Sequence, residues 1–487
     1  MTDVGTQAVR SFGWAGTSLI GSRVVALGTT LVLARLLTPT DFGVVAAGMV
    51  LLGFLEMGLD LGIAAALVYE QEKGVSDRVQ TAFTLNLIVA TALTAVGIAA
   101  APVVAGFFDV PGAEAMFRVL ALYLLVRGVG QVSDALLRRN LQFKRRAVVE
   151  LTRALVRAVV AISLAVAAPS AWAIVAGVLA GETAATIAAL SLARLRPTFA
   201  LRRDIASGLL RFGVPSAANR FTNQFSTNCD YLVIGNRLGA TTLGYYTMAF
   251  RLPELLIGNV LWIFSTVAFP TYARVRTQGQ RALRRTMLRA LRLTGLFGFA
   301  MGCYLAIASR DVVLVLFSQK WEPAAEPMAL ISLAIGVSAV GYASGDIFPA
   351  LGRPAALLAI DVPITLTLLA GYLLAAPYGM TAVAAVHLAL GVVYAVIRLG
   401  VANRLVGASA TEALEALRPA GLVALCVVVA ALPLRIVLGP GVAALGAITA
   451  ASALGVGAGL IISGPAVRAE IRAVLSVLRP RAAVAAR

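Results

Sequence analysis

Apolar segments long enough to cross a membrane follow one another along almost the whole chain, and this limits the fold more than any other feature. The chain of 487 residues is 60% hydrophobic and only 13% charged, whereas a soluble domain carries about a quarter charged residues. Only helices and closed barrels satisfy every backbone polar group in lipid, and such long apolar runs argue against a barrel. The sequence therefore predicts an all-α polytopic membrane protein with about fourteen spanning helices.

The basic residues between these segments predict the topology. We place the spans near residues 12–36, 41–68, 79–106, 114–137, 147–168, 171–193, 205–236, 243–271, 287–308, 326–350, 354–376, 379–401, 418–438 and 441–463. Threading them alternately gathers the most basic loops on one side, namely 138–146, 194–203, 274–292 and the tail after Val467. The other side holds only Arg237, Arg310, Lys320 and Arg435. Because Lys and Arg mark cytoplasmic loops, we expect a multi-pass inner-membrane protein with both termini in the cytoplasm.

An internal repeat divides the chain. The first half opens with "SFGWAGTS" and reaches "LARLLTPTDFGVV", while the second opens with "RFGVPSAA" and reaches "GNRLGATTLGYY". Gly43 aligns with Gly244, an offset of 244 − 43 = 201. Six spans per repeat give both repeats one orientation, related by an axis along the membrane normal. We therefore expect an N-terminal six-helix lobe at 1–203, a C-terminal six-helix lobe at 204–404, two additional helices at 405–465 and a cytoplasmic basic amphipathic tail at 466–487.

The composition signals none of the common enzyme chemistries. There is one histidine, His387, and the three cysteines lie far apart in apolar stretches. None of the three lysines lies in a phosphate-binding loop motif. The net charge of +18 is interpreted as cytoplasmic loops that meet anionic lipid heads, not as a nucleic-acid surface. We expect no catalytic residue, no metal and no cofactor.

Three stretches of the sequence resemble a known family. They are "LARLLTPTDFGVVAAGMVLLGFLEMGLDLGIAAALV" (33–68), "NCDYLVIGNRLGATTLGYYTMAFRL" (228–252) and "AFPTYARV" (268–275). They are similar to polysaccharide flippases of the Wzx type, within the multidrug/oligosaccharidyl-lipid/polysaccharide superfamily, and above all to lipopolysaccharide, capsule and teichuronic acid export proteins. The resemblance implies two lobes around a central cavity, alternating access and a polyprenyl-diphosphate-linked oligosaccharide as substrate.

Arginines within the predicted spans are the candidate diphosphate-binding residues. Arg23, Arg220 and Arg251 lie on the first, seventh and eighth spans, which the resemblance implies line the cavity. A guanidinium matches phosphate oxygens with a fork of donors and keeps its charge at depth. The alternative is structural pairing, of Arg23 with Glu56 or Asp60 and of Arg251 with Glu254 or Asp230.

A polar stripe on the seventh span is the candidate sugar path. Asn219, Asn223, Gln224 and Asn228 follow one another at about one helical turn, and such a stripe faces either a wet lumen or another helix. Candidate coupling or gating residues are the acids Glu56, Asp60 and Asp230. His387 is interpreted as structural, with proton transfer as the alternative.

The sequence thus predicts a flippase that moves an undecaprenyl- or decaprenyl-diphosphate-linked oligosaccharide from the cytoplasmic to the outer leaflet. It would serve surface polysaccharide or lipopolysaccharide biosynthesis, with glycosyltransferases and a polysaccharide polymerase as partners. One alternative is a cation-coupled multidrug exporter, whose cavity should be lined by acids. The other is a polytopic glycosyltransferase or polymerase, which needs a larger periplasmic loop than residues 309–325 supply.

Overall fold

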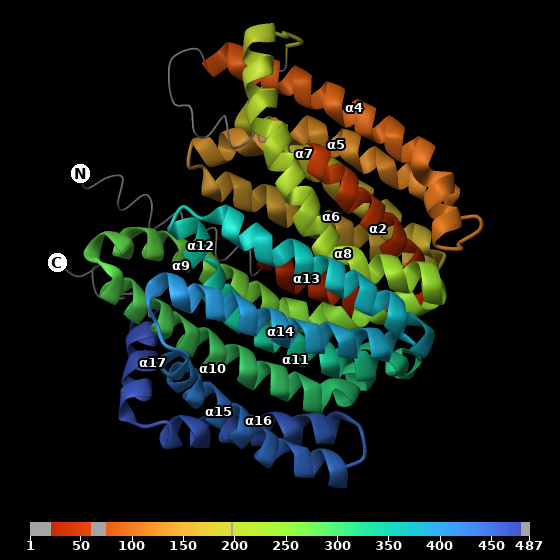
Figure 1. Cartoon of the computed structure of the whole chain (residues 1–487). Coiled ribbons are helices and arrows are strands. Elements are labelled where there is room, and N and C mark those ends of the chain that lie inside the picture. The colour runs from red at the N-terminus through yellow and green to blue at the C-terminus, as the bar shows by residue number, and fades with distance from the viewer. Residues whose placement is uncertain (1–20, 60–74, 196–197, 479–487) are drawn as a thin grey trace, which may run out of the picture. The chain divides into compact units, whose positions relative to one another are not determined.

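Helices form every regular element that the structure describes. The structure is a computed structural model that describes residues 21–59, 75–195 and 198–478. It divides by internal packing into two units, residues Met1–Thr247 and Met248–Arg487. Residues 21–36 of the first unit are helical. They are followed by α2 (Pro39–Leu59), α4 (Val75–Phe107), α5 (Glu114–Arg139), α6 (Phe143–Ala167), α7 (Ala171–Ala193) and α8 (Arg203–Pro253), which runs past the boundary of the unit (Figure 1).

The second unit begins at the end of α8 and continues through a π-helical turn, Glu254–Gly258. Its helices are α9 (Asn259–Val275), α10 (Gln280–Val312), α11 (Ala325–Gly345), α12 (Ile347–Ala350), α13 (Pro354–Ala375), α14 (Met380–Val406), α15 (Ala410–Val437), α16 (Val442–Ile462) and α17 (Pro465–Leu478).

The prediction of about fourteen spans is confirmed. Eleven helical segments of the described residues are long and apolar enough to cross a membrane. One of these segments, 224–278, contains parts of two predicted spans. The two parts are separated at Gly239, where the backbone leaves the helical conformation (φ 80°, ψ 172°). The first predicted span is helical over 21–36. The fifth is α6, a helix of 25 residues whose first half carries many charged side chains.

Small residues let helices of the second unit pack closely. On α10, Gly298 and Gly302 lie against Gly336 of α11, and a Cβ atom on Gly298 would come within 2.6 Å of the Gly336 carbonyl oxygen. Gly455 and Gly459 of α16 meet the backbone of α15 in the same way. Without a hydrophobic effect between helices in lipid, such close contact is what holds a bundle together.

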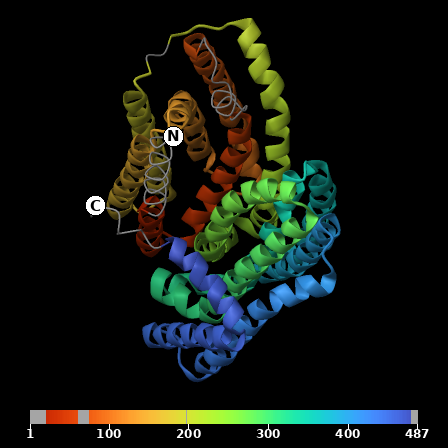
Figure 2. The same ribbon diagram turned by 90° about the vertical axis from the view of Figure 1, so that its left-hand side faces the viewer.

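The predicted additional helices and tail belong to the second unit. Figures 1 and 2 show α15 and α16 side by side against α10. The tail forms α17, whose Val467 and Ile471 join an apolar cluster built on α10 and α15. Glu470 of α17 pairs with Arg289 and Arg292 of α10, at 2.5 and 3.1 Å. The predicted amphipathic helix therefore begins by packing on the protein itself.

The aligned glycines of the two repeats meet inside the first unit. A Cβ atom on Gly43 would collide with the carbonyl oxygen of Ala240, and one on Gly244 would collide with that of Pro39. Between them, the hydroxyls of Thr40 and Thr241 lie 2.8 Å apart, and these residues are again 201 positions apart. We call this contact the glycine seam. Its two sides are equivalent positions of the two repeats, as expected where a pseudo-two-fold axis passes between them.

The glycine seam predicts the effect of adding one methyl group. Gly43→Ala forces the backbones of α2 and α8 apart, and overpacking of this kind costs about 1–3 kcal/mol. We expect the purified protein to unfold at a lower temperature in detergent. Gly28→Ala is the matched control, because a Cβ atom there would meet nothing within 4 Å. Equal unfolding temperatures for the two variants would contradict the close contact.

Candidate functional site

A buried carboxylate organises the polar interior of the first unit. Glu182 of α7 has only 3% of its side chain exposed, and its oxygens lie 3.1 Å from Nη1 of Arg127 on α5 and 2.8 Å from Nε of Arg153 on α6. A buried carboxylate without a cation would be strongly destabilising. Glu182 therefore binds α5, α6 and α7 to one another.

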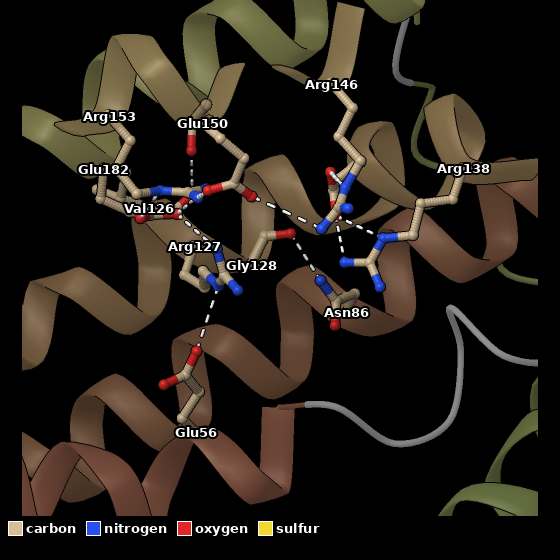
Figure 3. A network of polar contacts seen from close by, with 12 residues as sticks. Glu56, Asn86, Val126, Arg127, Gly128, Arg138, Arg146, Glu150, Arg153 and Glu182 are labelled. Carbon is tan, nitrogen blue, oxygen red and sulfur yellow. Dashed lines mark hydrogen bonds and ion pairs between the residues drawn. The ribbon is translucent and has the colours of Figure 1, made fainter. Parts of the chain in front are cut away.

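Each of these arginines holds a second acid, so that the pairs continue in both directions (Figure 3). Arg127 Nε lies 3.3 Å from Oε1 of Glu56 on α2. Arg153 Nη1 lies 2.6 Å from Glu150, and Arg146 links Glu150, at 3.7 Å, to Asp134, at 3.0 Å. Arg138 closes the series on Asp134. We call this series the ion-pair ladder: Glu56, Arg127, Glu182, Arg153, Glu150, Arg146, Asp134 and Arg138.

Helix periodicity and glycine explain how the ladder forms. Arg146, Glu150 and Arg153 recur every three or four residues along α6, so they share one face. Gly181 lets α7 approach that face, since a Cβ atom there would lie 2.8 Å from the carbonyl oxygen of Arg153. The carboxyl of Glu182, the next residue, then reaches across to α6. Four arginines and four acids make the ladder neutral as a whole.

The sequence left open whether Arg23 pairs with Glu56 or with Asp60, and the structure decides the first of these. Glu56 pairs with Arg127, so the alternative of a fixed Arg23–Glu56 pair is wrong. Arg23 is exposed on the helical residues 21–36 and makes no ion pair within the described part of the chain. Asp60, the other acid considered for Arg23, lies outside the described residues, as do the side chains of Arg220, Asn219 and Asn223 on α8.

The remaining candidates on α8 divide between a helix contact and local bonds. The Gln224 amide lies against Gly53 of α2, where a Cβ atom would collide with it, and Gly53 precedes Glu56 by one turn. The Asn228 amide donates to the backbone oxygen of Gln224 at 3.0 Å. Asp230 is buried and accepts from the backbone of Tyr231 at 2.9 Å and from the hydroxyl of Tyr246 at 3.0 Å. The structure thus brings Gln224 close to Glu56 and leaves Asp230 in an aromatic setting.

The second unit contains its own polar clusters. Arg251 lies exposed at the end of α8. Its role in binding the diphosphate stays a prediction, and the alternative of a pair with Glu254 or Asp230 stays open. On α14, Arg398 donates to the Tyr394 hydroxyl at 2.9 Å, and that hydroxyl donates to Asp361 of α13 at 2.6 Å. His387 is hydrogen-bonded to Tyr372 at 2.7 Å and stacks on its ring, which agrees with the structural interpretation of this histidine.

The ladder was missed by sequence reasoning. The sequence places Arg127, Asp134 and Glu182 inside predicted spans, but no pattern in one helix shows which charges on four helices meet. The spacing on α6 was the one available signal. Among the residues that the structure describes, no group of three His, Cys, Asp or Glu side chains is placed to hold a metal ion. What the site offers instead is a row of forked cations and hydrogen-bonding amides.

Comparison with known proteins places this arrangement in context. Residues 32–326 match the family described as polysaccharide biosynthesis protein. The chain is 26% identical to the succinoglycan biosynthesis transport protein ExoT of Rhizobium meliloti over 67% of its own length and 66% of that protein. It is 23% identical to the lipopolysaccharide biosynthesis protein WzxC of Escherichia coli over 68% of each chain. The alignments thus span about two thirds of these relatives.

A solved structure shares the fold. The lipid II flippase MurJ, in an inward closed conformation, superposes with a TM-score of 0.72 at 12% identity, over 91% of this chain and 97% of that one. At this identity, the likeness concerns the fold alone.

The ladder predicts that the same substitution, glutamate to glutamine, lowers the stability of the protein much more at Glu182 than at Glu114. Glu182→Gln removes a buried carboxylate from two arginines, and breaking such a pair costs about 3–5 kcal/mol. Glu114→Gln is the control, because Glu114 pairs with Arg118 at 3.2 Å with about half of each side chain exposed, where such pairs contribute at most about 1 kcal/mol. Unfolding in detergent should show a large loss for Glu182→Gln only. Similar stabilities for the two variants would contradict the central place of Glu182.

Proposed function

This chain belongs to the polysaccharide biosynthesis protein family, and on that basis we propose that it is a flippase for lipid-linked oligosaccharides. It moves a polyprenyl-diphosphate-linked oligosaccharide from the cytoplasmic to the outer leaflet by alternating access, and makes or breaks no bond. The observation that carries the proposal is the family match over residues 32–326. A fold alone does not fix a substrate, but a lipid II flippase shares this fold over nearly its whole length.

Membrane spans and basic loops support a location in the inner membrane with both termini in the cytoplasm. Eleven apolar helical segments make the chain a multi-pass membrane protein. In this orientation the basic loops face anionic lipid and the enzymes that build the oligosaccharide. Glycosyltransferases that supply the substrate and a polymerase that consumes it are the proposed partners. The two repeats, 1–203 and 204–404, would form the two lobes around the transport path, with 405–465 added to the second.

The proposed substrate site places forked cations where the diphosphate crosses. Arg23 and Arg220 lie on the first helices of the two repeats, and Arg251 lies on the helix after Arg220. Arg23 supports this role because it is exposed and makes no ion pair within the described residues. A diphosphate in hydrocarbon needs such partners to offset the loss of its water.

Amides and acids complete the proposed path. The amide stripe of α8 would meet the sugar, and its member Gln224 lies against α2 one turn from Glu56. Glu56, Asp60 and Asp230 are the proposed coupling or gating acids. Glu56 supports this role best, because 39% of its side chain is exposed although it pairs with an arginine.

Transport in proteoliposomes tests the function directly. The purified chain is reconstituted with a polyprenyl-diphosphate-linked disaccharide whose sugar carries a fluorescent label, and an impermeant reductant quenches the label in the outer leaflet. We expect the protein to expose the inner pool. Arg23→Lys should slow the exposure and Arg23→Ala or Arg220→Ala should slow it about ten- to hundredfold, since each charge-assisted hydrogen bond contributes about 1.5–3 kcal/mol.

Two controls make this result specific. Arg118→Ala removes an exposed arginine that pairs within its own helix and should leave transport unchanged. A fluorescent lipophilic cation tests the multidrug exporter alternative in the same vesicles. Movement of the cation without exposure of the labelled sugar would overturn the proposed function, and full activity of both alanine variants would overturn the arginine site.

A further inference from the structure

The two acids that share Arg127 differ in burial. Glu182 is nearly inaccessible, with 3% of its side chain exposed, and it also binds Arg153. Glu56 stands at the end of the ion-pair ladder with 39% exposed, and it approaches Arg127 through one atom pair, Oε1 to Nε at 3.3 Å. Figure 3 shows Glu56 reaching Arg127 from below, apart from the rest of the ladder. The two acids therefore hold Arg127 with unequal strength.

Because of this difference, the anion that pairs with Nε of Arg127 can be exchanged for another, whereas the anion at Nη1 cannot. If Glu56 leaves, its carboxylate is already accessible enough to be hydrated, and Arg127 keeps the buried Glu182. If Glu182 leaves, a charge is stranded in the interior. Exposed ion pairs are weak and buried ones are costly to break. A new anion can thus replace Glu56 with little loss, whereas Glu182 is fixed.

The free part of the guanidinium has the right shape for phosphate. Arg127 uses Nη1 for Glu182 and Nε for Glu56, while Nη2 donates to none of the described residues. The Nε–Nη2 edge therefore faces a single oxygen of Glu56. Two oxygens of one phosphate fill such an edge with parallel hydrogen bonds, which a single carboxylate oxygen does not do.

Two further polar side chains of the first unit lie on the same helices or against them. Tyr123 lies one turn before Arg127 on α5. Gln224 of α8 lies against Gly53, one turn before Glu56 on α2. A phenol one turn from Arg127 and an amide near the helix that carries Glu56 are donors suited to a phosphate that carries a sugar. All four side chains belong to the first unit.

We propose that Arg127 is a phosphate-binding residue, and that a phosphate of the lipid-linked substrate replaces Glu56 at its Nε–Nη2 edge. The inference rests on the proposed function for the nature of the substrate. Glu56 then acts as an internal competitor that neutralises Arg127 until the substrate arrives. Because Glu56 is the ladder's one residue on α2, its displacement removes the ladder's ion pair between α2 and α5, so that phosphate binding and the strength of this helix contact are linked reciprocally.

Binding of geranylgeranyl diphosphate to the full chain in detergent tests this inference. Glu56→Gln removes the competitor, so the Kd should fall about two- to fivefold, the range that corresponds to an exposed ion pair. Arg127→Lys keeps the charge beside Glu182 but loses the fork, so the Kd should rise about tenfold. In the Arg127→Lys background, Glu56→Gln should have a smaller effect. Glu114→Gln should change nothing.

Binding of geranylgeraniol, which lacks the phosphates, shows whether the gain in affinity depends on the phosphates. Its binding should be the same in the wild type and in Glu56→Gln; an equal gain for the alcohol would overturn the phosphate assignment. An unchanged or higher Kd for the diphosphate in Glu56→Gln would overturn the exchange while leaving the proposed function in place. Because Glu56 is partly exposed, this variant should fold, and it decides the question even if Arg127→Lys does not fold. A wild type that binds no prenyl diphosphate would count against both proposals.

Discussion

A carboxylate buried among helices fixes the first unit, because it must be neutralised where it lies. Glu182 meets this requirement with two arginines from two other helices, and each arginine needs further acids in turn. The ladder of pairs that results joins α2, α5, α6 and α7. Its neutrality is a constraint on the whole unit, since an uncompensated charge in the span region destabilises the fold.

The same constraint distinguishes charges that hold the fold from charges that can serve a substrate. Charges inside the ladder are satisfied by one another, so removing a buried one such as Glu182 harms folding before it harms binding. Arg23 lies outside the ladder, exposed and without an ion pair in the described residues. Arg127 stands between the two kinds, fixed on one side by Glu182 and weakly held on the other by Glu56.

Much of the fold could be predicted from sequence because it depends on patterns within one segment. Long apolar runs gave the spans, and the repeat aligned Gly43 with Gly244, which then proved to contact each other's helices. The glycines were noticed because equivalent residues recur in the chain. The amphipathic tail was recognised as a helix, but its packing on α10 was not, because that contact joins helices that lie far apart in the sequence.

The candidate site was less predictable because its contacts cross several helices. A pair of Glu56 with Arg23 was one alternative from the sequence, yet Glu56 pairs with Arg127, since α2 packs on α5. Gln224 and Asn228 belonged to one polar stripe by spacing. In the structure Gln224 lies against α2 and Asn228 bonds to its own helix. Periodicity places a residue on a face, but it does not tell what that face meets.

The proposed alternating access would separate the two repeats, and the glycine seam is one place where they meet within the first unit. In a chain whose natural cysteines are replaced by alanine, Thr40→Cys together with Thr241→Cys places two thiols where hydroxyls lie 2.8 Å apart. The decisive measurement is exposure of the labelled lipid-linked sugar in proteoliposomes before and after oxidation. Our account predicts that the disulfide stops transport, that reduction restores it and that neither single cysteine has an effect. Transport at the same rate through the cross-linked protein would contradict it.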